Sequence, residues 1–130
     1  MITEEVVQQL HLNSPDFTKV RIGLLHLLLQ HTSASLTINE NADPAVRQDF
    51  ETFFNHIAPD LAPTQTQYHH HDEGPDDLPA HFKASILGQS LILPIKHGKL
   101  ALGTWQGIYL GEHRQHAQSR CIIATTQGQV

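Results

Sequence analysis

The sequence of 130 residues contains one cysteine, Cys121, so the chain cannot form a disulfide within itself. Because two isoleucines follow Cys121, we expect its thiol to be buried and unreactive. No apolar run is long enough to span a membrane, and the first residues lack the basic and then apolar pattern of a secretory signal. We therefore expect a cytoplasmic protein with no membrane partner.

Basic residues are scarce and scattered: eight Lys and Arg stand against 13 Asp and Glu, for a net charge of -5. Phosphate binding needs clustered cations, so nucleic acid is not expected as a partner. The sequence also lacks a Gly-rich phosphate loop, a CxxC pair and a GxSxG turn, which argues against a nucleotidase, a zinc ribbon and a serine hydrolase. Its length and 39% hydrophobic content fit one folded domain over residues 1–130.

Apolar patterning in the first half predicts helices and strands. A helix is expected over residues 1–12, ended by the turn residues 13–16. Residues 20–31 are apolar on both faces of an extended chain, which favours a central strand covered on both sides, although a buried helix has the same pattern. A short strand is expected over residues 36–38. Asp43 and Pro44 then open a helix whose apolar stripe should be core: Val46, Phe50, Phe53, Phe54 and Ile57.

In the second half, a helix is expected from about Asp76 to Gly88, with Asp77 and His81 four residues apart on it. Strands follow over residues 90–96 and 99–110, joined by a two-residue turn at His97 and Gly98. Pro94 has no amide hydrogen, which makes the first of these strands an edge strand or bulged. A last strand is expected over residues 120–126.

Eleven histidines are unusual for a chain of this length. Most of those in the loop before the second helix are expected to be solvated. Three of the eleven histidines could nevertheless converge to bind a zinc ion: His31 from a strand end, His70 from the loop and His81 from a helix. Asp77 would then orient His81. The spacing of the three histidines alone matches no metal motif.

Two further polar groups are candidate site residues. Asn39 and Glu40 precede the capped helix, and a capping role does not account for them. Trp105 and Gln106 follow Gly103 near the end of a predicted strand. Adjacent strand residues point to opposite faces, so at most one of Trp105 and Gln106 lines a given pocket.

The chain resembles the YjbQ-type family, called secondary thiamine-phosphate synthases. The resemblance covers about residues 20–128 and rests on three segments: HTSASLTINENADP at residues 31–44, residues 68–85 around YHHHDEGPDD and HFKAS, and SLILPIKHGKLALGTWQGI at residues 90–108. It implies an α+β fold with a β-sandwich-like core of mixed sheets, two or three helices and a homotrimer. Family members usually carry a leading strand before the first helix. None is seen here, so an exposed edge is expected where it would pair.

The resemblance also implies a metal site built from His31, His70 and His81. If the alignment with the family's middle segment is shifted by one residue, the second ligand is His71 and not His70. Asn39, Glu40, Trp105 and Gln106 become expected neighbours of that site with catalytic roles. The metal is expected to be divalent, zinc first and magnesium second.

The function implied is condensation of a pyrimidine methyl diphosphate with a thiazole phosphate, which releases diphosphate. The cation, with Lys83, Arg114 or Arg120, would neutralise the diphosphate. Two alternatives stay open. One is a metal-dependent hydrolase with Glu40 as general base, and the other is a non-catalytic trimer that binds a metal or small ligand.

Overall fold

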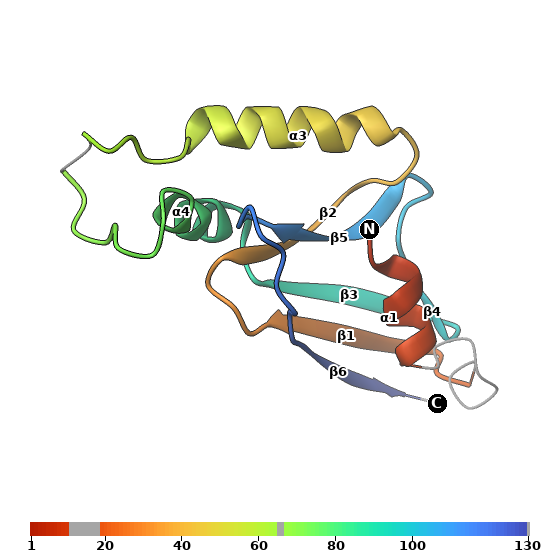
Figure 1. Cartoon of the computed structure of the whole chain (residues 1–130). Coiled ribbons are helices and arrows are strands. Elements are labelled where there is room, and N and C mark those ends of the chain that lie inside the picture. Colours follow the sequence, from red (N-terminus) through yellow and green to blue (C-terminus); the bar gives the residue numbers. More distant parts are fainter. Residues whose placement is uncertain (11–18, 65–66, 130) are drawn as a thin grey trace.

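The computed structural model describes residues 1–10, 19–64 and 67–129 (Figure 1). The predicted turn at residues 13–16 lies outside the described residues. Within them the helices are α1 (Thr3–Gln9), α3 (Pro44–Ile57) and α4 (Asp77–Leu87), and the strands are β1 (Ile22–Leu29), β2 (Ala34–Glu40), β3 (Ser90–Lys96), β4 (Lys99–Leu100), β5 (Gln106–Glu112) and β6 (Ile122–Gln129).

The strands form two antiparallel sheets, one of four strands in the order β4-β3-β1-β6 and one of two strands, β2-β5. Their inner faces share one apolar core: Leu25, Leu27, Leu29, Leu93 and Ile95 from the larger sheet, and Ala34, Leu36 and Ile108 from the β2-β5 ribbon. Burial of these side chains is the main favourable term in folding. The predicted α+β fold with two packed sheets is confirmed.

Strand β1 is central, as predicted, but only one of its faces is covered. Leu25, Leu27 and Leu29 are buried, whereas Ile22 and Leu24 on the other face are 65% and 49% exposed. The expectation of cover on both faces is wrong, because none of the described helices packs on the outer face of the four-stranded sheet. That outer face is defined here by Ile22, Leu24, Leu28, Ile92 and Ile123.

The β3-β4 hairpin turns at His97 and Gly98, both with positive φ, as expected for a two-residue turn. Strand β4 pairs with Ile95 and Lys96 and ends before Pro94, whose carbonyl accepts the amide hydrogen of Ala101 at 2.9 Å. Pro94 thus lies where β3 has no full strand partner on that side, as its missing amide predicts. The single strand predicted over residues 99–110 is wrong. A turn interrupts it, and β4 and β5 lie in different sheets.

Helix α3 begins as predicted: the Asp43 carboxylate accepts the amide hydrogen of Ala45, and Pro44 occupies the first turn. Its apolar stripe is not core, because no residue of α3 is buried and Phe53 is exposed. The helix lies apart at the top of Figure 1. Helix α4, in contrast, packs against β2, buries five residues and ends at Gly88, whose φ is 97°.

Cys121 is exposed, not buried as predicted, because it precedes β6, whose residues are largely exposed themselves. Among the described residues, no helix has the length and apolar character needed to cross a bilayer.

Candidate metal centre

The β2-β5 ribbon has two chemically different ends. Ala34 pairs with Glu112 at one end, here called the histidine end, and Glu40 pairs with Gln106 at the other, here called the tryptophan end. Six residues along a strand span about 20 Å. Helix α4 lies at the histidine end, and α1 and the N-terminus lie near the tryptophan end (Figure 1).

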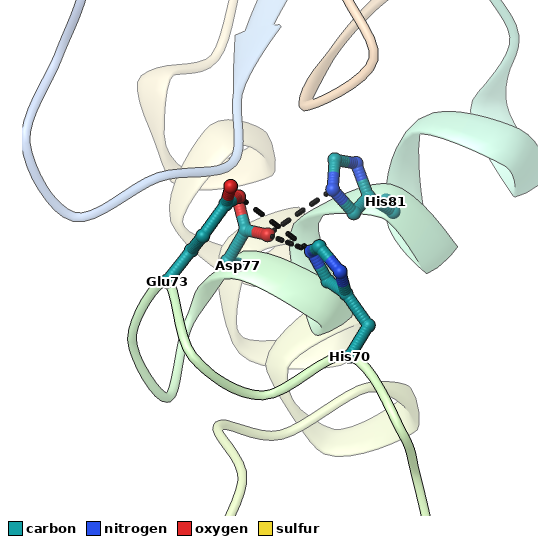
Figure 2. A group of neighbouring side chains, drawn as sticks. All are labelled: His70, Glu73, Asp77 and His81. Carbon is teal, nitrogen blue, oxygen red and sulfur yellow. Dashed lines mark hydrogen bonds and ion pairs between the residues drawn. The ribbon is translucent and has the colours of Figure 1, made fainter.

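Four side chains of the types that bind metal ions converge at the histidine end. The loop before α4 supplies His70 and Glu73, and the first turns of α4 supply Asp77 and His81, which point toward one another in Figure 2. Nε2 of His70 lies 2.7 Å from Oδ2 of Asp77 and 3.5 Å from Oε2 of Glu73. Nε2 of His81 lies 3.2 Å from the same Asp77 oxygen. All four donor atoms lie within 4.8 Å of one another.

The orientation of His81 is set by a backbone carbonyl. Its Nδ1 lies 2.8 Å from the carbonyl oxygen of Thr32, just before β2. A carbonyl only accepts, so Nδ1 carries the hydrogen, and in the neutral ring Nε2 presents a lone pair. Nε2 lies 3.2 Å from Oδ2 of Asp77, which is also an acceptor. This contact becomes favourable when His81 carries a second proton or when a cation lies between the two atoms.

Asp77 is the buried member of the group, with 4% of its side chain exposed. Burial alone would raise the pKa of its carboxyl, but hydrogen bonds from His70 and the charges of His81 and Arg114 outweigh it and lower the pKa. The hydrogen bond to Asp77 in turn raises the pKa of His70. The site therefore holds an ionised carboxylate against two imidazoles.

His71 is not in the group. Its Nδ1 pairs with Oδ1 of Asp72 at 3.2 Å, and both side chains are exposed. Of the two candidates left by the sequence, the structure places His70 in the cluster.

His31 is near but is engaged elsewhere. The amide of Cys121 donates to its Nε2 at 2.8 Å, which occupies the lone pair that would bind a metal. The structure joins His70 and His81 and leaves His31 out. It adds Asp77, which the sequence suggested only as an orienting residue, and Glu73, which was not among the expected ligands. The sequence carried a signal for both: Glu73 lies three residues after His70 in the loop, and Asp77 lies four residues before His81 on the helix, so each carboxylate is close to a histidine.

The cations predicted to bind diphosphate are engaged within the protein. Arg120 donates to both oxygens of Glu112, at 2.5 and 2.6 Å, and to Oγ of Ser33. Nζ of Lys83 is bonded to Asn55 at 2.6 Å, its side chain is buried, and burial lowers its pKa. Neither residue presents a free charge at the histidine end.

The other predicted residues gather at the tryptophan end, about 20 Å away along the ribbon. Asn39 caps the amide of Glu40, and Gln106 accepts the amide of Gly103 at 2.7 Å. None of the described residues hydrogen-bonds to Oε2 of Glu40. Trp105 lies in a turn, not a strand, and is 66% exposed. Within one chain these four residues cannot act on a metal bound at the histidine end.

Comparisons with known proteins identify relatives over nearly the whole chain. A family model described as UPF0047 protein YjbQ-like matches residues 1–129. The UPF0047 protein YjbQ of Escherichia coli O157:H7 is 56% identical over 129 residues, covering 99% of this chain and 88% of the relative. A crystal structure of a YjbQ/UPF0047 protein from Clostridium acetobutylicum is 34% identical and has a TM-score of 0.74, covering 98% of this chain and 87% of its own.

These relatives do not support the enzymatic function that the resemblance implied. A further solved structure, from Sulfolobus solfataricus (TM-score 0.74, 26% identity, 96% and 82% of the chains), is described as a YbjQ-like protein of unknown function. None of these descriptions names a reaction. The prediction of thiamine-phosphate synthase activity is therefore wrong as a statement of this chain's function. The comparisons show common family membership: the chain belongs to the YjbQ-like UPF0047 family.

Proposed function

We propose that the chain binds one divalent transition-metal ion, with zinc as the best match, through His70, Asp77 and His81. The observation that carries this proposal is the convergence of their donor atoms within 4.8 Å of one another, with Nε2 of His81, which bears no hydrogen in the neutral ring, 3.2 Å from Oδ2 of Asp77. A metal ion between them would turn a repulsive contact into two ligand bonds. Donor atoms about 2.0–2.2 Å from zinc stand about 3.3–3.5 Å apart in a tetrahedral site. The His81–Asp77 separation of 3.2 Å is close to this, whereas Nε2 of His70, 2.7 Å from the Asp77 oxygen, must move outward to bind the ion.

The donor types favour zinc over magnesium. Two imidazoles and one carboxylate are a common set for zinc, whereas magnesium prefers six oxygen ligands, most of them water. Glu73 lies on the exposed loop, with 64% of its side chain exposed, so the fourth position can be released to water or to a small molecule. A zinc ion with such an open position acts as a Lewis acid and lowers the pKa of bound water to about 7.

Metal content tests this proposal. Elemental mass spectrometry and calorimetric zinc titration would be run on wild type, His81→Ala and His31→Ala, with circular dichroism to verify folding. We expect one zinc per chain in wild type and in His31→Ala, because the lone pair of His31 is used by Cys121. We expect His81→Ala to lose the ion. Wild-type protein that does not bind zinc, or His81→Ala that binds it equally, would overturn the proposal.

We also propose that the chain forms a homo-oligomer, a trimer according to the family resemblance, through the outer face of the four-stranded sheet. Five apolar residues of this face are exposed, and Ile22 and Ile92 are each 65% exposed. The register places His26, Lys96, Thr125 and Gln127 among them, so the face is apolar with polar positions. Exposed apolar side chains gathered on one face mark an interaction site. Another copy of the chain offers the same surface at the same concentration.

The oligomeric state is measurable by light scattering after gel filtration. Wild type is expected at three times the chain mass of 14.5 kDa. Ile92→Lys places a charge in the proposed interface and should lower the mass, whereas Ile86→Lys, at an exposed position on α4, should not. A monomeric wild type would contradict this assembly. The cytoplasmic location stays a prediction, which cell fractionation would check.

A further inference from the structure

We propose that Arg114 determines which metal ion the site accepts, because it withholds one oxygen of the Asp77 carboxylate from the ion. The inference rests on the proposed metal site and names its selectivity residue. Arg114 follows β5 at the histidine end of the ribbon and is not itself a metal ligand.

The guanidinium of Arg114 binds three points around the cluster. Its Nη1 donates to Oδ1 of Asp77 at 2.5 Å, its Nε to Oδ2 of Asp76 at 3.0 Å, and its Nη2 to the carbonyl of Glu73 at 3.1 Å. The planar fork of arginine makes such simultaneous contacts, which a lysine cannot. One side chain thus ties the loop that carries Glu73 to the helix start that carries Asp77.

The two oxygens of Asp77 are divided between these partners. Oδ1 is held by Arg114, and Oδ2 faces the histidines. The carboxylate can therefore offer a metal ion one oxygen only. Calcium takes six to eight oxygen ligands and often binds carboxylates through both oxygens, whereas zinc binds four ligands and accepts a single oxygen. Because Arg114 occupies one of the two Asp77 oxygens, the site favours zinc over calcium.

Arg114 is itself held in place from outside the cluster. Its own amide donates to Oε1 of Glu112 at 2.9 Å, and Arg120 binds both oxygens of Glu112. The amide of Gln115 donates to Oδ2 of Asp76 at 2.9 Å, the same oxygen that Nε of Arg114 binds. The guanidinium is thus fixed before any metal binds, as selection between ions requires.

Two substitutions separate the geometry of Arg114 from its charge. Arg114→Met removes charge and hydrogen bonds, and Arg114→Lys keeps the charge but cannot hold all three contacts. Zinc and calcium affinities would be measured by calorimetry. Arg47→Met is the control, because it removes an arginine that packs over the ring of Tyr109 and is not part of the four-donor group. We expect both variants at Arg114 to bind zinc about 10–100-fold more weakly and to lose part of the zinc preference.

Cobalt provides a readout of coordination that does not depend on a variant. Four-coordinate cobalt(II) absorbs visible light far more strongly than six-coordinate cobalt(II). We expect a strong spectrum in wild type and a weaker one in both Arg114 variants. A weak, six-coordinate spectrum in wild type would overturn the inference, even if both variants failed to fold.

The outcomes also distinguish this inference from the metal site itself. A wild-type chain without zinc affinity removes both. Zinc binding in wild type, with an unchanged ratio of zinc to calcium affinity in both Arg114 variants, leaves the site and removes the role of Arg114. If Arg114→Met alone changed both affinities by one common factor, charge and not geometry would be responsible, and the inference would be wrong.

Discussion

Nε2 of His81 lies 3.2 Å from Oδ2 of Asp77, and both atoms are hydrogen-bond acceptors when the ring is neutral. The arrangement follows from the helix: residues four apart lie on one face of α4, and the Thr32 carbonyl fixes the tautomer of the imidazole. His70 approaches the same oxygen from the loop. A buried carboxylate oxygen shared by two imidazoles is the central feature of the candidate metal centre.

Replacement of Asp77 by Asn tests its place in the site. The amide keeps the shape of the carboxylate but removes the charge that a cation requires. Zinc affinity should fall by about 100-fold or more, because even supporting residues outside a ligand set contribute 10–100-fold. Calorimetric titration would measure it, with Asp72→Asn as the matched control at an exposed carboxylate. Equal affinities in the two variants would exclude Asp77 as a ligand.

A pair of alanine variants tests which neighbouring histidine binds the metal. His70→Ala should remove the bound zinc, because Nε2 of His70 lies in the four-donor group. His71→Ala should keep it, because His71 pairs with Asp72. Zinc content by elemental mass spectrometry gives the answer directly. The reverse pattern would show that the ligand register is shifted by one residue.

Acid should destabilise the fold through His113. Burial lowers its pKa from 6.5 to about 4, with Lys83 adding to the shift, and its Nε2 is hydrogen-bonded to Ser35 at 2.8 Å. The unfolded chain therefore binds more protons than the folded one between these pH values. The contribution of His113 is fully present above pH 6.5 and is lost as the pH falls toward 4.

The size of this contribution is on the order of 1 kcal/mol between pH 7 and pH 5, after allowance for partial exposure. Urea unfolding at both pH values would measure it in metal-free protein. His113→Gln should lose less stability on acidification than wild type, whereas exposed His116→Gln should behave like wild type. The same pH dependence in all three proteins would contradict the assignment.

The shared core of the two sheets should respond strongly to truncation. Ile95→Ala removes a side chain that is 1% exposed and should lower the free energy of unfolding by about 2–5 kcal/mol, since a cavity remains. Ile86→Ala makes the same change on α4, where the side chain is 58% exposed, and should lower the free energy of unfolding by much less than Ile95→Ala does. Chemical denaturation measures both. Similar losses at the two positions would argue against the core described here.

The turn at the tryptophan end depends on Asn41. Its Nδ2 donates to the carbonyls of Thr104 and Gln106, both at 3.1 Å. Asn41→Ala should loosen this turn and lower the fluorescence anisotropy of Trp105, the only tryptophan. Zinc affinity should not change, because the cluster lies about 20 Å away along the ribbon. Asn39→Ala, which loses only a local bond to Glu40, is the control.

Local signals in the sequence predicted the elements that depend on neighbouring residues. Asp43 and Pro44 marked the start of α3, Gly88 the end of α4, and His97 with Gly98 the hairpin turn. These features follow from backbone preferences and caps, which act within a few residues. The family resemblance added the two-sheet fold.

The same local signals misplaced the surroundings of those elements. The apolar stripe of α3 and the second face of β1 were expected to be buried, and both are exposed. Apolar periodicity tells which residues share a face but not what that face meets. The strand predicted over residues 99–110 is divided between two sheets, because the turn at Gly103 is closed by hydrogen bonds to a distant segment at Asn41.

The family, the α+β class and the presence of histidines and carboxylates suited to a metal ion were all recognisable from the amino-acid sequence. Which of these side chains meet depends on how the chain folds. The tertiary structure assigned His31 to the amide of Cys121, set Asp77 between His70 and His81, and placed Glu40 and Trp105 at the far end of the ribbon. The physical reason is that strand pairing and helix docking set long-range distances, and side-chain chemistry along the chain does not encode them.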